Sequence, residues 1–454
     1  MSALITRMKD ILIIAWPLIV ANSFWNLQLT IDRIFLGKHS TESLGAAMAV
    51  MGVFWVLMAL LQQTASYITT FVAQYYGANE SHKIGSCFWQ AIYVSVVGGL
   101  AFIGLNFVSA DFFAFVGHAP NVQVLEVEYF NSISYSALPT ALVAAISGFY
   151  TGLGRTKIIM AINCVGLVLN IILDYAMIFG NLGFPAWGVA GAGYATAIAT
   201  YGSAIFGLFL VLRPKLDEQF RILQDWRPNL KVCLQFLRFG LPSGMQWALE
   251  GLAFTVFLII MGRMSGGEAA LASSSIAVTV MMLSVLPSMG IAQAVMTIVG
   301  QKLGQKTPNV AEQAVWDGVR LTSIYMGIVA LTFVLIPEFY LSWFENSENQ
   351  ALWSDVSKLV PRLLQIVAVF TLLDSIYLNI SFALKGAGDT NFVSIVALLV
   401  PWPVMVLPAY LVREMDQAVV IAWWFAALYS LSVVSILVVR FRGGRWKTMS
   451  VIQG

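Results

Sequence analysis

The sequence predicts an all-α protein that crosses a membrane twelve times. Only 11% of its 454 residues are charged, whereas soluble globular proteins carry about 25% charged residues. The mean hydropathy is +0.80, and mostly apolar segments of the length that a membrane helix needs, about 20 residues, recur along the whole chain. The net charge of +2 gives no indication of a nucleic-acid partner.

These segments form two sets of six on either side of a long polar connection, RPKLDEQFRILQDWRPNLK. The first set lies near residues 11–36, 44–75, 86–110, 127–149, 158–180 and 188–212, and the second near 233–262, 270–299, 317–343, 359–385, 392–412 and 418–440. The first segment is too long for the apolar core of a signal peptide, so we expect it to be retained. The connection predicts an N-terminal six-helix lobe over 1–218 and a C-terminal six-helix lobe over 219–454.

Basic residues accumulate in alternate connections, which predicts the orientation in the membrane. One side receives most of the Lys and Arg residues, among them Arg7, Lys83, Arg213, Lys302, Lys385 and Arg445. The other side receives only Lys38, Arg263, Lys358 and Arg413. We therefore expect a multi-pass protein of the cytoplasmic (inner) membrane with both termini in the cytoplasm.

The two halves of the chain resemble each other. Aligning AWPLIVANSFWNLQLTIDRIFLGKHS with GLPSGMQWALEGLAFTVFLIIMGRMS places Pro17 on Pro242. Later in each half, SGFYTGLGRTK aligns with SFALKGAGDTN. Because each half has six spans, the halves share one orientation, which predicts a parallel internal repeat with a cavity between two bundles and alternating access by rocking.

Cofactor chemistry is not indicated. The three cysteines are odd in number and widely spaced, which argues against a disulfide framework or a thiolate metal site. The three histidines, His39, His82 and His118, lie far apart, and no phosphate-binding P-loop is present. We expect no cofactor and no use of ATP.

Polar residues inside the first-half spans point to a cation site. Asp32 lies on one helical face with Asn22, Trp25 and Gln28, and Asn170 and Asp174 lie one turn apart in the fifth span. Two carboxylates and an amide oxygen suit Na⁺ or a shared proton, and Thr196 in the sixth span adds a hydroxyl. The alternative for each acid is a structural ion pair with a basic residue of a neighbouring helix, although ionisable groups inside a membrane are functional by default.

The second half has its own polar set. Gln246 and Glu250 share a face of the seventh span, and Asp374 and Tyr377 share a face of the tenth. Glu250 and Asp374 therefore form a second candidate carboxylate pair. For Gln246 and Tyr377 the alternative is ordinary hydrogen bonding between helices.

Aromatic and thioether side chains suit a cavity for aromatic cations. The candidate lining residues are Trp25, Gln28, Gln246, Phe254, Phe257, Met281 and Tyr377. The alternative is packing or lipid contact, which accounts for most aromatic residues of a membrane protein. Pro17 interrupts the first span and is a candidate hinge, with a kink that serves only packing as the alternative.

The pattern resembles the multidrug and toxic compound extrusion (MATE) family. The motifs that carry this resemblance are TIDRIFLG in the first span, GLPSGMQWALE in the seventh and TLLDSIYLNISFALKGAGDTN in the tenth. The resemblance covers essentially the whole chain. It implies a V-shaped antiporter that exports organic cations and other drugs in exchange for Na⁺ or H⁺.

The resemblance also implies roles for individual residues. Asp32 matches the first-helix aspartate of the family, Asn170 and Asp174 match its amide and acid pair, and Thr196 is a looser match. Glu250 and Asp374 resemble acids of the NorM-type branch. Two departures stand out: Phe370 replaces a tyrosine common in NorM-like relatives, and Arg33 places a permanent charge beside Asp32.

Two other functions compete with the drug exporter. A flippase for lipid-linked substrates belongs to the same superfamily, but it would favour a basic cavity, whereas the spans of this chain carry mainly acids. An integral membrane enzyme would need a catalytic cluster that the scattered histidines do not supply. As partners we expect small-molecule drugs or organic cations and the lipid bilayer, and we expect a monomer.

Overall fold

The computed structural model describes residues 2–264, 267–344 and 350–452, and all regular structure in these ranges is helical. Every predicted span falls on a helical segment. In the first half the helices are α1 (Ser2–His39), α2 (Thr41–Ser66), α3 (Ile68–Gly77), α4 (Ile84–Gly104), α5 (Ser109–Val116), α6 (Pro120–Ile133), α7 (Ala137–Gly152), α8 (Lys157–Phe179), α9 (Gly188–Val211) and α10 (Pro214–Phe220). In the second half they are α11 (Leu230–Gly262), α12 (Gly267–Gly304), α13 (Pro308–Leu335), α14 (Pro337–Leu341), α15 (Gln350–Ala387), α16 (Thr390–Leu399), α17 (Leu407–Leu411) and α18 (Ala418–Arg442).

Eleven segments of the described chain are long and apolar enough to cross a membrane. They coincide with the second to the twelfth predicted spans. The first predicted span, 11–36, lies inside the continuous helix α1 and is not among the eleven. The protein is therefore an all-α, multi-pass membrane protein.

Some spans have interruptions that periodicity does not predict. The span 44–75 consists of α2 and α3, which meet at Tyr67. The span 392–412 contains a π-helical turn over Trp402–Val406 between α16 and α17. Pro401, Pro403 and Pro408 surround or occupy this turn, and a proline removes a backbone donor from the helical ladder.

The chain separates into two compact units, each with its own core. The first-half unit comprises Val20–Met245, Gly300–Thr307 and Ser450–Gly454, and the second-half unit comprises Met1–Ile19, Gln246–Val299 and Pro308–Met449. Both α1 and α11 therefore change unit shortly after a proline: the new unit begins three residues after Pro17 in α1 and four residues after Pro242 in α11. The predicted lobe boundary between residues 218 and 219 stays a prediction.

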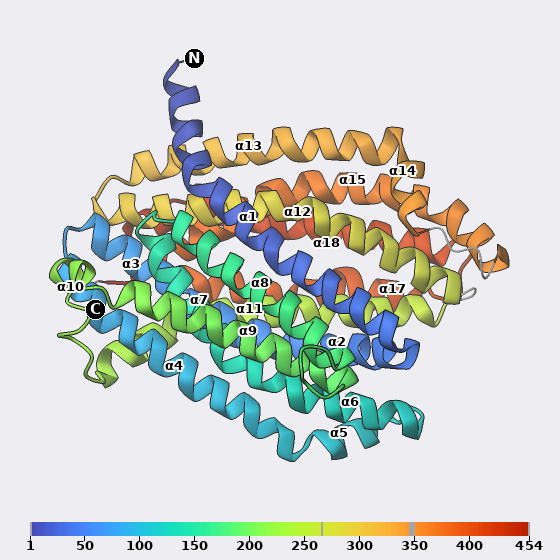
Figure 1. The fold of residues 1–454 in the computed structure, drawn as a ribbon. Helices are drawn as coiled ribbons and strands as arrows, with labels where there is room; N and C mark the ends of the chain where they lie inside the picture. Colours follow the sequence, from blue (N-terminus) through green and yellow to red (C-terminus); the bar gives the residue numbers. More distant parts are fainter. Residues whose placement is uncertain (1, 265–266, 345–349, 453–454) are drawn as a thin grey trace. The chain divides into compact units, whose positions relative to one another are not determined.

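Within the first-half unit, α2, α4 and α6 to α9 run alongside one another (Figure 1). The core between them includes Phe54, Phe102 and Phe130, whose rings lie 5.3 Å and 6.3 Å apart in successive pairs. Glycines allow close approach of the backbones here. A Cβ on Gly193 of α9 would lie 2.0 Å from Oγ of Ser132 in α6, so only glycine permits this packing.

Within the second-half unit, α13, α15 and α18 pack together. The buried Trp423 of α18 donates from Nε1 to Oγ of Ser274 at 3.0 Å and contacts Phe257 edge to face at 5.8 Å. The N-terminal part of α1 is attached to this unit. Arg7 Nε donates to Oδ2 of the buried Asp317 at 2.6 Å, and this hydrogen bond raises the pKa of Arg7 above its ordinary value.

Candidate functional site

The predicted first-half site assembles inside the first-half unit. Asp32 comes from α1, Asn170 and Asp174 from α8, and Thr196 from α9. All four side chains are buried: Asn170 and Asp174 are 0% exposed, and Asp32 and Thr196 are 5% exposed. The structure thus brings together residues that are up to 164 positions apart, from Asp32 to Thr196.

Asn170 connects the other three residues of this cluster through hydrogen bonds. In the amide orientation that satisfies its surroundings, Nδ2 donates to Oδ1 of Asp32 at 3.0 Å and to Oδ2 of Asp174 at 3.2 Å. Its Oδ1 then accepts from Oγ1 of Thr196 at 3.3 Å. The amide therefore uses both of its N–H groups on the two acids, so their relative position depends on it.

The two acids also interact directly. Asp32 and Asp174 lie within hydrogen-bonding reach of each other. Because an ionised carboxylate only accepts hydrogen bonds, a bond between two carboxyl groups requires a proton on one of them. Oδ1 of Asp174 is buried and has no hydrogen-bond partner among the described residues. The cluster thus has the oxygen atoms and the charge to hold a proton or a small cation.

Two neighbours shape this site. Tyr129 of α6 is buried and interacts electrostatically with both acids. The sequence does not predict Tyr129 as a site residue, because a lone tyrosine in an apolar span carries no distinctive signal. Arg33, by contrast, has an exposed side chain. Successive helical residues point about 100° apart, which explains why Asp32 is buried while Arg33 is not.

The second-half cluster lies inside the second-half unit and is built around Gln246. Its Nε2 lies 2.9 Å from the hydroxyl of Tyr377, 3.2 Å from Oε1 of Glu250 and 3.3 Å from Oγ of Ser381. Tyr377 also donates a hydrogen bond to Oε1 of Glu250. This arrangement joins α11 to α15 and places the carboxyl group of Glu250 among three polar side chains.

Lys385 is an additional member of this cluster and corrects the sequence-based assignment. The basic-residue pattern placed it in a connection, but it lies inside α15 and is only 2% exposed. Its Nζ lies 4.4 Å from the ring centre of Phe382 and 5.7 Å from that of Trp247, and its charge interacts with Glu250. Asp374 is half-buried and interacts electrostatically with Glu250. The second-half cluster therefore combines two acids with a buried ammonium group.

The remaining predicted residues lie at different places. Trp25 contacts Trp55 edge to face at 5.6 Å, and Gln28 is buried. Phe257 and Met281 are buried within the second-half unit, and the partly buried Phe254 contacts Phe257 at 5.7 Å. The assignment of these residues to a substrate cavity stays a prediction, as does the hinge at Pro17. Phe370, the departure noted in the tenth span, is buried.

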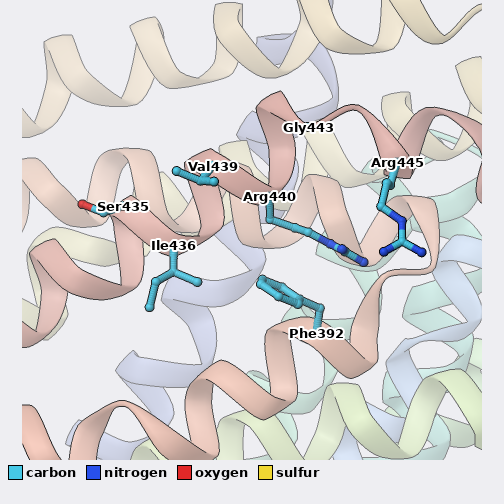
Figure 2. Close-up of a pocket in the computed structure, with 7 residues that line it drawn as sticks. All are labelled: Phe392, Ser435, Ile436, Val439, Arg440, Gly443 and Arg445. Carbon is cyan, nitrogen blue, oxygen red and sulfur yellow. The ribbon is translucent and has the colours of Figure 1, made fainter.

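No group of three or more His, Cys, Asp or Glu side chains that could hold a metal ion occurs in the described part of the chain. Two hollows on the described surface have volumes of about 540 Å³ and 410 Å³. The larger is shown in Figure 2. Neither is lined by a predicted site residue.

Comparison with known proteins gives consistent matches over nearly the whole chain. The sequence model of the family described as MatE matches residues 17–176 and 242–411. The chain is 26% identical over 442 residues to the "Probable multidrug resistance protein NorM" of Agrobacterium fabrum, covering 96% of this chain and 94% of that protein. It is 25% identical over 452 residues to the protein of the same name from Thermotoga maritima, covering 98% and 94%.

Solved structures share the fold. A transporter of the MOP superfamily from Pyrococcus furiosus superposes with a TM-score of 0.88 at 22% identity, covering 98% of this chain and 97% of that chain. A multidrug resistance MATE family transporter in its outward-facing conformation has the same TM-score, identity and coverage.

Proposed function

Because the chain belongs to the MatE family of multidrug transporters, we propose that it exports organic cations and other drugs in exchange for Na⁺ or H⁺. Membership makes the chain a transporter rather than an enzyme, which removes the membrane-enzyme alternative, and transporters of this family need no cofactor. The exchange reaction, the coupling ion and the substrates are our proposal. The membrane flippase of the same superfamily is the competing function.

The observation that carries the proposal is the first-half cluster. Two carboxyl groups with 0% and 5% exposure lie in helices of a membrane protein, and the amide of Asn170 donates a hydrogen bond to each of them. Transfer of a single carboxylate to the middle of a bilayer costs on the order of 2.5–3.5 kcal/mol on insertion scales, and a close like-charged pair costs more. Uptake of a proton or Na⁺ removes this cost, so the energy of the cluster depends strongly on cation occupancy.

We assign the coupling ion to the first-half cluster rather than to the second. Lys385 already supplies a buried positive charge close to Glu250 in the second-half cluster. A mobile cation would enter that site against this charge. In the first-half cluster the charge of Arg33 also acts on Asp32, but the Arg33 side chain is exposed and is not buried among the cluster residues as Lys385 is in the second unit.

The proposed cycle couples this occupancy to conformation. Cation binding at Asp32, Asn170 and Asp174 neutralises the acids and favours one state of α1, and the drug leaves as the cation binds. Release of the cation to the cytoplasm restores the charged pair and allows a new drug to bind. Coupling requires only that the two states differ in cation affinity. Pro17 lies between Asp32 and the N-terminus of α1 and is the proposed hinge of this motion.

We also propose the membrane in which the protein lies, the side of its termini and its oligomeric state. The excess of basic residues in alternate connections supports cytoplasmic termini in a cytoplasmic (inner) membrane. A monomer is sufficient, because each unit contains all side chains of its own cluster.

The test uses purified protein in proteoliposomes that contain a fluorescent cationic dye. Dye efflux is measured under an imposed Na⁺ gradient and, separately, under an imposed pH gradient. We expect one of the two gradients to drive efflux, Asp32→Asn to abolish the dependence on that gradient, and Asp10→Asn to retain it, because Asp10 is an exposed acid of the same helix. Efflux driven by neither gradient, together with movement of a fluorescent lipid-linked probe between leaflets, would establish the flippase instead.

A further inference from the structure

The larger hollow lies at the C-terminal end of α18 and is separate from both polar clusters. We call it the α18 hollow. It has a volume of about 540 Å³ and is lined by Phe392, Ser435, Ile436, Val439, Arg440, Gly443 and Arg445. Phe392 comes from α16, the following residues come from α18, and the last two lie just beyond its end. All of them belong to the second-half unit.

One end of the α18 hollow is apolar. Ile436 and Val439 are three positions apart on α18, so they lie on one face of the helix. They are 36% and 71% exposed. Since α18 is one of the segments that can cross a membrane, these side chains face hydrocarbon rather than water. An acyl chain is the natural neighbour of this end.

The other end is basic. Figure 2 shows the guanidinium groups of Arg440 and Arg445 together at one end, with Ser435 and Ile436 at the opposite end. Arg440 is held in place by two bonds to Asp389, Nε to Oδ2 at 2.7 Å and Nη2 to Oδ1 at 3.1 Å, and by the ring of Phe392 at 4.6 Å. Its Nη1 makes no hydrogen bond to the described residues.

Arg445 is a basic residue of the α18 hollow whose charge is available to bind an anion. Its side chain is exposed and makes no ion pair within the described chain. Gly444 precedes it with φ of +74°, in the left-handed region, and ends the helix so that the chain turns back beside the hollow. Arg445 therefore reaches the hollow from outside α18 while Arg440 reaches it from the helix itself.

The surrounding charge is positive. Lys447 forms an ion pair with Glu312 at 2.5 Å, and Asp389 forms an ion pair with Arg440. Arg442 lies 5.9 Å from the ring centre of Trp316. Both acids of this region are thus neutralised by two of its basic residues, whereas Arg442 and Arg445 have no acidic partner among the described residues. An anion is attracted to this end of the hollow.

We propose that the α18 hollow binds one anionic phospholipid, with the phosphate group at Arg445 and Nη1 of Arg440 and one acyl chain along Ile436 and Val439. A free phosphate ion would use only the basic end. A zwitterionic lipid would bring its own ammonium group close to two guanidinium groups. Basic pockets beside membrane helices on the cytoplasmic side are typical sites for anionic headgroups, and the basic-residue pattern places this end of α18 on that side.

The test measures lipid binding to the full-length protein by native mass spectrometry. Protein purified in a neutral detergent is titrated with phosphatidylglycerol, phosphatidylcholine or inorganic phosphate. We expect phosphatidylglycerol to bind with one tight site and phosphatidylcholine to bind at least fivefold more weakly. Arg445→Gln should weaken phosphatidylglycerol about fivefold, the effect expected for one basic residue near an anionic headgroup, and Arg445→Glu should weaken it further.

Arg413→Gln is the matched control. Arg413 precedes the N-terminus of α18, which has 25 residues, so it lies roughly 37 Å along the helix axis from the basic end of the α18 hollow. We expect this variant to bind phosphatidylglycerol as the wild type does. Equal affinity for phosphatidylglycerol and phosphatidylcholine, or an equal loss in the Arg413 and Arg445 variants, would overturn the proposal. Displacement of the lipid by millimolar inorganic phosphate would show an anion site without lipid selectivity and would overturn it as well.

Discussion

Nδ2 of Asn170 donates to Oδ1 of Asp32 across the interface of α8 and α1, at 3.0 Å. The same amide holds Asp174, so one neutral side chain sets the spacing of two buried acids. This relationship makes Asn170 the most informative position of the first-half cluster after the acids themselves.

Asn170→Ala should weaken cation coupling although both carboxyl groups are retained. A hydrogen bond to a charged group contributes about 1.5–3 kcal/mol, so we expect the half-saturating concentration of the coupling ion to rise roughly tenfold or more. The measurement is the initial rate of dye efflux as a function of Na⁺ or H⁺ concentration. Asn163→Ala serves as the control because Asn163 lies on the same helix and its side chain donates to the backbone oxygen of Ala21 at 3.3 Å rather than to either acid. An unchanged half-saturation in Asn170→Ala would show that the bridge does not matter for coupling.

Lys385 and Glu250 should show non-additive effects on stability. Removal of one member leaves the other charge less well compensated in a buried setting, which is destabilising. We expect Lys385→Met and Glu250→Gln each to lower the free energy of unfolding, and the double variant to lose about 1–2 kcal/mol less than the sum of the single losses. Thermal unfolding of the four proteins in detergent gives this cycle. Strict additivity would indicate that the two charges do not interact.

Gly193 should not tolerate even a methyl group. The Cβ of Gly193→Ala would lie 2.0 Å from Oγ of Ser132 and 2.7 Å from the backbone nitrogen of Ile133, so the helices must separate. Overpacking of this kind costs about 1–3 kcal/mol. Gly251→Ala is the control, because a Cβ at that position meets nothing within 4 Å and alanine favours helix. The unfolding midpoint should fall for the first variant and stay or rise for the second.

The N-terminal part of α1 should detach more readily when its partner acid is removed. Asp317 also accepts from Nη1 of Arg320 at 2.9 Å, so Asp317→Asn weakens two ion pairs at once. We expect trypsin to cut after Arg7 and Lys9 a few times faster in this variant, since local opening governs cleavage of folded segments. Glu80→Gln removes the exposed pair with Lys83 and should leave that cleavage rate unchanged. Equal cleavage in the wild type and Asp317→Asn would mean that other contacts hold the segment.

Part of the site could be predicted from spacing alone. Asn170 and Asp174 are one helical turn apart, and Asp32 had no other reason to be in an apolar span, so helix geometry and the cost of burying charge identified these three residues as candidates. Lys385 and Tyr129 were missed for a physical reason. A lysine near the end of a span reaches either water or the interior, and only the position of Phe382 and Trp247 directs it inward.

The sequence by itself determined the fold class and the positions of the eleven spans that the described chain contains, because hydropathy and helix length reflect the bilayer directly. It also identified the acids that lie inside predicted spans, where the cost of burying a charge calls for a functional reason. Only the tertiary structure decided that Asn170 joins Asp32 to Asp174, that α1 and α11 each change unit after a proline, and that Lys385 is buried with a charge that acts on Glu250. These features depend on contacts between segments far apart in the chain, and such contacts follow from side-chain packing rather than from any local pattern.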